Sequence, residues 1–411
     1  MSSVLPDIRV QPHSPSLQRG IPGSGQELDI DIVSTLDAVR DAWLDLQSDN
    51  RNSLHQGYDW CAAWVETHGY PLAIVRGRLG SETAFLLPLE IQRHNMVRTA
   101  QFIGTRYTNI NTGLFAASLW DGERRIDTDK LASLIAESLT GYADLVSLQN
   151  IPLTWRGSRH PLASLPADEH LNHTFQLPLS ADFTATINQL NGKRRRKKFR
   201  NQVRKIEATG SFEHVIARTP EEKRDLLSQF FVQKAVRFKA LGLPNVFHAP
   251  QTQAFFHRVL EVSQEGADAP LEMHGLLLHG EYEGKIAALA GLSRKGDHVI
   301  CQFGSIDENI LPEASPGELL FWLLIERACS RGAAMFDFGL GDQDYKRRWC
   351  TEETVQHDIL LPVSALGRFA AVAHRGVSRG KAAIKGNPHL YALIQRLRAQ
   401  QDKAPATESD D

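Results

Sequence analysis

The sequence has few cysteines, no long apolar run and almost no net charge. Its four cysteines, Cys61, Cys301, Cys329 and Cys350, are widely separated, which argues against a disulfide framework and against a CxxC metal site. No apolar stretch approaches the roughly 20 residues that span a bilayer, and the N-terminus lacks the apolar core of a signal peptide. A formal net charge of -2 does not favour the whole molecule as an electrostatic partner of nucleic acid. We therefore expect a cytoplasmic globular protein with reduced, buried thiols and no metal site.

The chain is long enough for two ordinary domains, with 411 residues. A lead rich in proline, glycine and serine is expected to be disordered. Composition and hydrophobic pattern predict the following segments: a disordered lead (1–26), an N-terminal domain (27–154), a linker (155–180), a C-terminal domain (181–365), and a basic amphipathic tail helix with an acidic disordered end (366–411).

The two long segments share an order of predicted elements, namely helices, an antiparallel meander, a helix and a strand. In the first segment, strand-like runs at 72–78 and 83–92 flank a turn. In the second, three strands end with 298–306, and a strand at 355–361 is expected to close the unit. The pattern predicts an α/β protein with mixed α+β sheets, built from two similar units.

A strongly basic helix is predicted from Lys193 to Ala208. Phe199, Val203 and Ile206 fall on one face at helical spacing, so the cations around them lie on the other faces. Solvated surface, attraction of phosphates from coenzyme A or from an anionic glycan or lipid, and RNA binding all remain open, although the chain as a whole is not basic.

A helix start lies between two predicted strands. Ser315 stands at the cap position and Pro316 at the first helical position, before an apolar run at 319–328. The first amides of a helix lack intrahelical partners, and the helix dipole favours an anion there. The amides of Gly317 and Glu318 could therefore hold a diphosphate, although the carboxylate of Glu318 opposes this. A capped structural helix explains the pattern equally well.

Three motifs together resemble a known family. They are NGKRRRKKFRNQVRKIEATG, SPGELL and FDFGLGDQDYKRRW, and they are similar to the CelD/BcsL group of GNAT-type acyltransferases. That group is related in architecture to the FemAB-type aminoacyltransferases. The resemblance is strongest from Leu190 to Trp349 and weaker from Leu28 to Pro152. It implies two tandem GNAT-like units, of which we expect the first to lack a cofactor site.

The resemblance also implies an acyl-CoA-dependent N- or O-acyltransferase, with acetyl-CoA or another acyl-CoA as co-substrate. The predicted strand around Gln302, Phe303 and Gly304 would diverge from the strand at 334–338 and receive the pantetheine arm. The diphosphate would lie at the helix start already described. The predicted cofactor-binding residues are thus Gln302, Phe303, Gly304, Ser315, Gly317 and Glu318.

Acyl transfer needs a group that removes the acceptor's proton and a group that protonates the leaving sulfur. Asp337, Asp342 and Asp344 are candidate bases, although turn formation is the simpler interpretation of the last two. Tyr345 could protonate the sulfur or simply be buried, and Lys346 could pair with a carboxylate or bind a phosphate.

Acceptor contacts are predicted from two regions. Tyr107 and Asn109 lie in a polar loop at 104–113 that could close over an acceptor. His274 lies on a predicted strand and could face the cleft with Gln302, although a structural role is the simpler interpretation.

Two rival functions remain. One is a FemAB-like transferase that uses aminoacyl-tRNA, and the other is a non-catalytic GNAT-like subunit of a polysaccharide synthase. The family name implies a link with cellulose or exopolysaccharide production, so the expected partners are a small-molecule or glycan acceptor and a membrane-associated synthase. We expect no nucleic acid other than tRNA, and a cytoplasmic location that extends to the periphery of the inner membrane.

Overall fold

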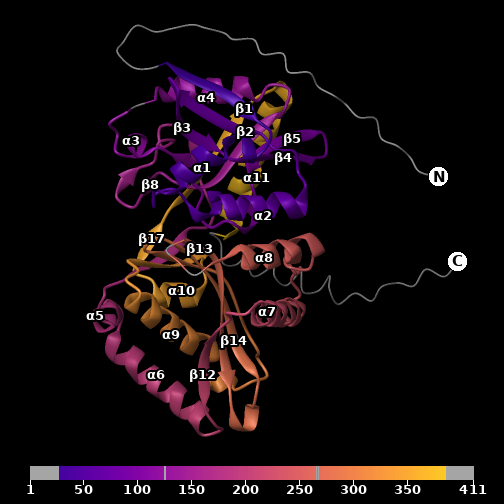
Figure 1. Cartoon of the computed structure of the whole chain (residues 1–411). Helices are drawn as coiled ribbons and strands as arrows, with labels where there is room; N and C mark the ends of the chain where they lie inside the picture. Colours follow the sequence, from indigo (N-terminus) through magenta and orange to yellow (C-terminus); the bar gives the residue numbers. More distant parts are fainter. Residues whose placement is uncertain (1–26, 125, 265, 267, 386–411) are drawn as a thin grey trace, which may run out of the picture.

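The computed structural model describes residues 27–385 except 125, 265 and 267 (Figure 1). The expected disordered lead and most of the predicted tail lie outside these residues. Two units are stacked in Figure 1, the first above the second. Within the described residues, no helix has the length and apolar character needed to cross a bilayer.

The first unit contains two sheets, with strand orders β1-β2-β3-β6 and β10-β18-β7-β5-β4. Its elements are β1 (Leu28–Val33), α1 (Arg40–Gln47), the 3-10 turn η2 (Leu54–Gln56), α2 (Tyr58–His68), β2 (Ile74–Leu79), β3 (Glu82–Leu87), β4 (Leu89–His94), β5 (Val97–Phe102), β6 (Leu114–Phe115), α3 (Ala117–Trp120), α4 (Thr128–Ser138) and β7 (Leu145–Pro152).

Short strands follow the first unit: β8 (Thr154–Trp155), β9 (Ser158–Arg159), β10 (Ala167–Glu169) and β11 (Thr174–Pro178). The second unit adds α5 (Phe183–Asn188), α6 (Gly192–Glu207), β12 (Phe212–Ile216), α7 (Pro220–Ala240), α8 (Pro250–Val262), β13 (Asp268–Leu278), β14 (Ile286–Lys295), β15 (His298–Ile306), α9 (Pro316–Ser330), β16 (Met335–Leu340), α10 (Asp344–Trp349) and β17 (Glu352–Thr354). The chain then continues into β18 (Gln356–Pro362) and α11 (Ala365–Lys385).

The predicted repeat is present in the topology. In the second unit, β13, β14 and β15 form an antiparallel meander, and β15 then pairs in parallel with β16 after the crossover helix α9. In the first unit, β5 pairs in parallel with β7 after α4, and Pro88 separates β3 from β4 in the strand that matches β14. Each unit thus joins a meander to a parallel strand pair.

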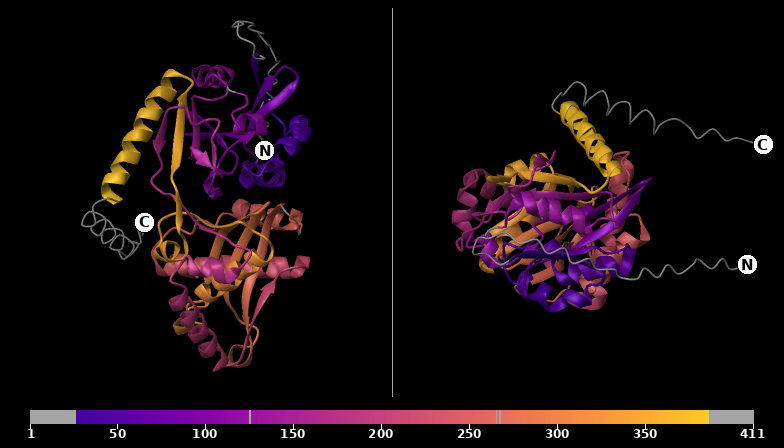
Figure 2. Two further views of the ribbon diagram at one scale, coloured as in Figure 1. Left: turned by 90° about the vertical axis from the view of Figure 1, so that its left-hand side faces the viewer. Right: turned by 90° about the horizontal axis from the view of Figure 1, so that it is seen from above.

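The units exchange strands, which differs from the predicted boundaries. β18 was expected to close the second unit, but it pairs antiparallel with β7 of the first. β11 falls in the predicted linker, yet it pairs with β16 and β17 of the second unit. The left view of Figure 2 shows the β18 segment running up into the first unit, with α11 along its outer side. Hydrophobic periodicity fixes which face of a strand is buried, but not the sheet that it joins.

A continuous apolar core connects the units. Trp60 and Trp64 of α2 pack against Phe255 of α8, with both pairs of ring centroids 5.1 Å apart. In the second unit, α9 covers one face of the sheet, while α7 and α8 lie against the other. The first unit lies against the part of the second sheet that contains His298, Gln302 and Asp337.

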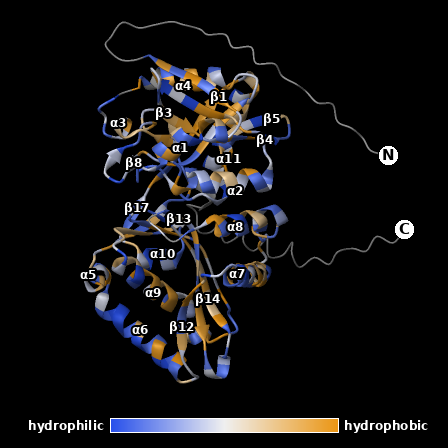
Figure 3. Cartoon of the chain, in the orientation of Figure 1, coloured by the Kyte–Doolittle hydropathy of each residue, from blue (hydrophilic) through white to orange (hydrophobic). Residues whose placement is uncertain are grey.

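The basic helix is α6, and its predicted apolar face is correct. Ile206 is buried, and the ring of Phe199 stacks on Trp322 of α9 with 4.5 Å between centroids. The outer face of α6 is strongly hydrophilic (Figure 3). Its exposed cations are Lys193, Arg194, Lys197, Arg200, Arg204 and Lys205.

Candidate functional site

β15 and β16 part soon after they begin to pair. Their parallel register covers only His298–Met335, Val299–Phe336 and Ile300–Asp337, although β15 continues to Ile306 and β16 to Leu340. The divergence predicted at residues 302–304 is therefore present. The divergence leaves a wedge-shaped opening between the two strands, although the backbone groups of Gly339 and Leu340 on the β16 side already have hydrogen-bond partners.

A β-bulge lies at the start of this opening. Gly291 of β14 faces Phe303, whereas the next residue, Leu292, faces Cys301, so Gln302 is the extra residue. Bulges redirect side chains and are common beside functional sites. Here the amide of Gln302 reaches His55 of the first unit.

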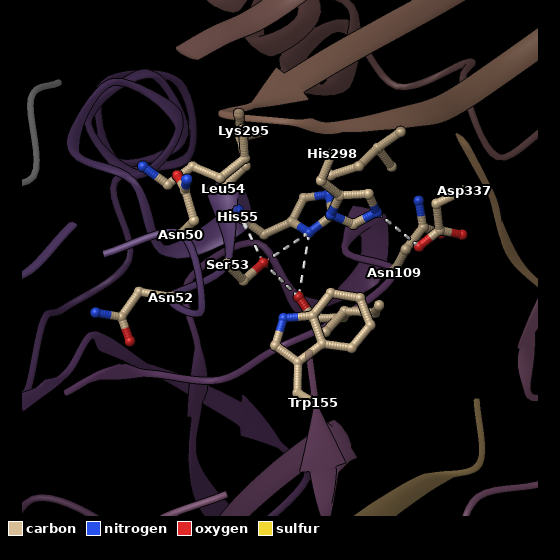
Figure 4. Close-up of a pocket in the computed structure, with 12 residues that line it drawn as sticks. Asn50, Asn52, Ser53, Leu54, His55, Asn109, Trp155, Lys295, His298 and Asp337 are labelled. Atoms are coloured by element: carbon tan, nitrogen blue, oxygen red, sulfur yellow. Dashed lines mark hydrogen bonds and ion pairs between the residues drawn. The ribbon is translucent and has the colours of Figure 1, made fainter. Parts of the chain in front are cut away.

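A pocket between the units lies directly beside this point (Figure 4). One wall comes from the first unit and the segment after it, and the other comes from β14, β15 and β16. The lining residues are Asn50, Asn52, Ser53, Leu54, His55, Asn109, Ile110, Trp155, Lys295, His298, Ile300 and Asp337.

His298 and Asp337 form a buried pair in this pocket. His298 Nε2 lies 3.3 Å from Asp337 Oδ2, and the ring of Trp155 lies 5.4 Å from the His298 ring. The Asp337 carboxylate also accepts hydrogen bonds from the backbone N–H of Gly339 at 2.7 Å and from Gln176 Nε2 at 3.3 Å. With its Nε2–H directed to Asp337, the histidine keeps a lone pair on Nδ1, which can accept a proton.

His55 is fully buried and faces the same pocket. Its Nδ1 lies 3.2 Å from the carbonyl of Ile110, which only accepts, so Nδ1 carries the proton. Its Nε2 then accepts from Gln302 Nε2 at 2.9 Å. Burial lowers the pKa of His55 to about 4, so the ring is neutral at pH 7 and holds Gln302 in place by a neutral hydrogen bond.

Asn109 spans the opening between the two strands. Its Nδ2 donates to Gln302 Oε1 at 3.4 Å, and its Oδ1 accepts from the N–H of Leu340 at 3.2 Å. The predicted position of Asn109 at the acceptor side is consistent with this bridge. Tyr107, from the same loop, instead packs among aromatic rings and donates its hydroxyl to the carbonyl of Val246 at 2.6 Å. Its ring and hydroxyl are used to join the units, and it is outside the pocket lining.

Of the three predicted carboxylates, Asp337 lines the pocket and the other two do not. Asp342 pairs with Arg347, with 2.5 Å between Oδ1 and Nε. Asp344 is exposed at the first residue of α10. A base role for Asp342 or Asp344 would therefore require an acceptor outside this pocket.

Lys346 and Tyr345 lie on α10, just beyond β16. The Lys346 ammonium donates to the carbonyls of Gly339 and Leu340 at 3.0 and 2.7 Å, and burial lowers its pKa to about 8. The Tyr345 ring stacks on Phe321 with 5.6 Å between centroids, and burial raises the pKa of its hydroxyl. Lys346 thus fixes the end of β16, and Tyr345 is a protonated phenol at neutral pH.

The start of α9 lies where the sequence predicts it, but its backbone geometry is unusual. Ser315 has a φ of 50° and makes no side-chain cap hydrogen bond; its carbonyl accepts from the N–H of Glu318 and of Leu319 at 3.0 and 3.3 Å. A Cβ on Gly317 would lie 2.8 Å from Ile306 of β15. Ser315 is thus the cap residue and Pro316 the first helical residue, as predicted, but the serine contributes its carbonyl and not its hydroxyl to the helix amides.

A carboxylate already occupies the basic surroundings of this helix start. Glu318 pairs with Lys198, and its oxygens lie 4.0 Å from Arg195 Nη1 and 3.8 Å from Arg348 Nη2. The amide of Glu318 is also used inside the helix. The residues fit a diphosphate poorly while Glu318 holds these cations, because a carboxylate repels the incoming anion.

The remaining predicted residues lie away from the pocket lining. Phe303 stacks on Phe230 in the inter-unit core with 4.1 Å between centroids, and Gly304 pairs with Ala290 of β14. His274 is fully buried on β13, with Nδ1 3.1 Å from His214 Nε2 and Nε2 3.4 Å from a Glu272 oxygen.

Sequence reasoning missed His55, His298 and Trp155. His298 had a usable signal, because it begins the strand expected beside the Asp337 strand. His55 and Trp155 reach the pocket from the first unit, and no local pattern marks them.

Comparisons with known proteins agree with this geometry. Residues 193–347 match the family described as acetyltransferase (GNAT) domain. The second unit has a GNAT-type acyltransferase fold. The crystal structure of FemX superposes with a TM-score of 0.54 at 12% identity, covering 78% of this chain and 96% of that one. A protein of unknown function from Bacteroides thetaiotaomicron VPI-5482 gives 0.50 at 11%, covering 81% and 100%. No curated protein matches the sequence.

These similarities establish two tandem GNAT-like units as the fold. Neither superposition specifies a reaction, since both identities are low. Among the described residues, no group of His, Cys, Asp and Glu side chains is placed to hold a metal ion.

Proposed function

We propose that the protein transfers an acyl group from acyl-CoA, such as acetyl-CoA, to an amine or hydroxyl bound between the units. The observation that carries this proposal is the divergence of β15 and β16 immediately beyond the His298–Asp337 pair. An extended thioester arm would enter this opening and pair with the β15 side, because the Gly339 and Leu340 backbone groups of β16 are already hydrogen-bonded, and its carbonyl would then be directed toward the pocket. The match of residues 193–347 to a GNAT domain supports the same reaction class.

In this proposal His298 is the general base. Its Nδ1 takes the proton of the acceptor while Asp337 orients the ring through Nε2. The acceptor nitrogen or oxygen attacks the thioester carbonyl carbon, the tetrahedral intermediate collapses, and the carbon–sulfur bond breaks. The Tyr345 hydroxyl supplies a proton to the departing thiolate. Asn109 and the His55–Gln302 pair position the acceptor beside the opening.

Donor phosphates would bind near the start of α9. We propose that a diphosphate replaces the Glu318 carboxylate as the partner of Lys198, Arg195 and Arg348. The diphosphate would take over the charge-assisted contacts of these cations, and the displaced Glu318 carboxylate would still oppose its binding.

Three measurements test the main proposal. Acetyl-CoA should raise the thermal unfolding midpoint of the full chain. Thiol release from acetyl-CoA should accelerate with some members of a panel of amino sugars, amino acids and polyamines, and His298→Asn should abolish that acceleration without abolishing the thermal shift. Absence of acetyl-CoA binding in calorimetry would rule out the donor.

A second candidate is transfer of an aminoacyl group from tRNA. The exposed cations of α6 favour it, because they could contact RNA phosphates. The pairing of Glu318 with Lys198 also favours it, because this carboxylate occupies the cations that a coenzyme A diphosphate would need. The fold is shared with FemX, and FemAB-type enzymes use aminoacyl-tRNA as donor. This candidate predicts that the protein forms a salt-sensitive complex with charged tRNA and does not bind coenzyme A. The resemblance to CelD/BcsL proteins supports a glycan acceptor and a synthase partner for either donor. A protein that copurifies with a polysaccharide synthase but binds neither donor would instead be a non-catalytic subunit.

A further inference from the structure

α11 presents an apolar face to solvent. Its inner side packs on the first unit, where Ala371 is 1% exposed and a Cβ on Gly367 would overlap the carbonyl of Asp144. On the outer side, Phe369 is 74%, Val372 68% and Val377 58% exposed. An amphipathic helix on a globular domain normally buries its large apolar side chains. On α11 these side chains instead face solvent, and small residues face the domain.

Two loops adjoin the beginning of α11. Val97, at the tip of the β4–β5 hairpin, packs against the apolar cluster that holds Ala371. Asp144, before β7, accepts hydrogen bonds from the N–H groups of Val363 and Ser364. Each loop carries an exposed large apolar side chain, Met96 at 72% and Tyr142 at 48%. We call the surface formed by residues 93–98, 141–144 and 365–381 the α11 surface.

The charge of the α11 surface has one sign. Its exposed cations are Arg93, Arg368, Arg379 and Lys381. Its acidic residue, Asp144, is 8% exposed and pairs with Arg98. At the neighbouring edge strand β10, Asp168 pairs with Arg375.

We propose that the α11 surface binds the surface of an anionic lipid bilayer. Exposed Phe, Met, Tyr and Val side chains flanked by arginine and lysine suit the boundary between headgroups and acyl chains. A protein partner of ordinary composition would offer apolar contacts but not a continuous negative charge that meets all four cations. The proposal is independent of the proposed transferase activity, because none of these residues lines the inter-unit pocket.

Vesicle sedimentation of the full chain tests it. The protein should sediment with vesicles of phosphatidylcholine mixed with phosphatidylglycerol, should not sediment with phosphatidylcholine alone, and should dissociate at high salt. Phe369→Asp with Val372→Asp should weaken binding by at least about tenfold, because two membrane-inserting side chains become charged.

The matched control is Val232→Asp with Val236→Asp on α7, where both valines are similarly exposed at 64% and 59%. This variant should bind like the wild type. Arg368→Glu with Arg379→Glu gives a second variant that leaves the apolar face intact and should also lose binding. Equal binding to neutral vesicles, or full binding by both α11 variants, would overturn the proposal. So would a dimer in size-exclusion chromatography that Phe369→Asp with Val372→Asp dissociates, since a second copy would then cover the surface.

Discussion

His298 Nε2 lies 3.3 Å from Asp337 Oδ2, and the two residues come from the last paired stretch of β15 and β16 before the strands part. The fold thereby places a histidine–carboxylate pair at the base of an opening suited to an extended donor. The same pair faces a pocket that the other unit completes. In the proposed acyl transfer, this pair lies where the acceptor needs a base.

The first prediction concerns His298. His298→Asn should lower turnover by about a hundredfold or more, because the acceptor loses its general base, while the affinity for acetyl-CoA stays near the wild-type value. Asp337→Asn should act in the same direction through the orientation of the ring. His94→Asn, an exposed histidine at the end of β4, is the control. Wild-type turnover in the His298 variant would remove it as the base.

The second prediction concerns Gly339, which touches Asn109. Gly339 has a φ of 74°, and a Cβ there would lie 2.8 Å from Asn109 Oδ1. Gly332 has a φ of 69° with nothing within 4 Å, so Gly332→Ala has the same backbone strain without the overlap. Gly339→Ala should therefore reduce the free energy of unfolding by roughly 1–2 kcal/mol more than Gly332→Ala. Equal losses in denaturant titrations would mean that the Asn109 bridge is loose.

The third prediction concerns the buried ammonium of Lys346. Its folded-state pKa of about 8 is below the ordinary value of 10.5, so between these pH values the unfolded state binds more protons. The stability of the wild type relative to Lys346→Met should therefore rise from pH 8 to pH 10.5, by up to about 1.4 kcal/mol per pH unit. Parallel denaturant titrations at several pH values measure the difference. A flat difference would show that the amine is hydrated in the folded state.

The fourth prediction concerns Glu318. If its carboxylate competes with donor phosphates, Glu318→Gln should tighten coenzyme A binding about tenfold at low ionic strength, and the gain should shrink as salt is added. Glu326→Gln, an exposed position on the same helix, should leave the affinity unchanged. Weaker binding by the Glu318 variant would instead make that carboxylate part of the donor site.

Several features followed from the sequence because they depend on local patterns. The spacing of Phe199, Val203 and Ile206 gave the buried face of α6, and Pro316 marked the beginning of α9. The strand divergence came from a family resemblance. Asp337 was a candidate base because it lies near the end of the strand predicted at 334–338, where a carboxylate could accept a proton from an acceptor.

Other features depend on contacts between distant segments. His55 and Gln302 are 247 residues apart and meet only after the units pack. Tyr107 lies in a polar loop, yet the aromatic rings of the other unit surround it. The backbone of Ser315 takes a left-handed conformation that its residue type does not favour, so the position of the cap could be predicted but not the absence of a side-chain hydrogen bond from the serine.

The reciprocal placement of β11 and β18 limits how the molecule can be divided. A fragment cut between the units would lack an interior strand of its sheet, or would carry a strand with no sheet to join. Such halves should aggregate when expressed separately and recover only when made together. The two units therefore fold as one cooperative structure, although their topologies are alike.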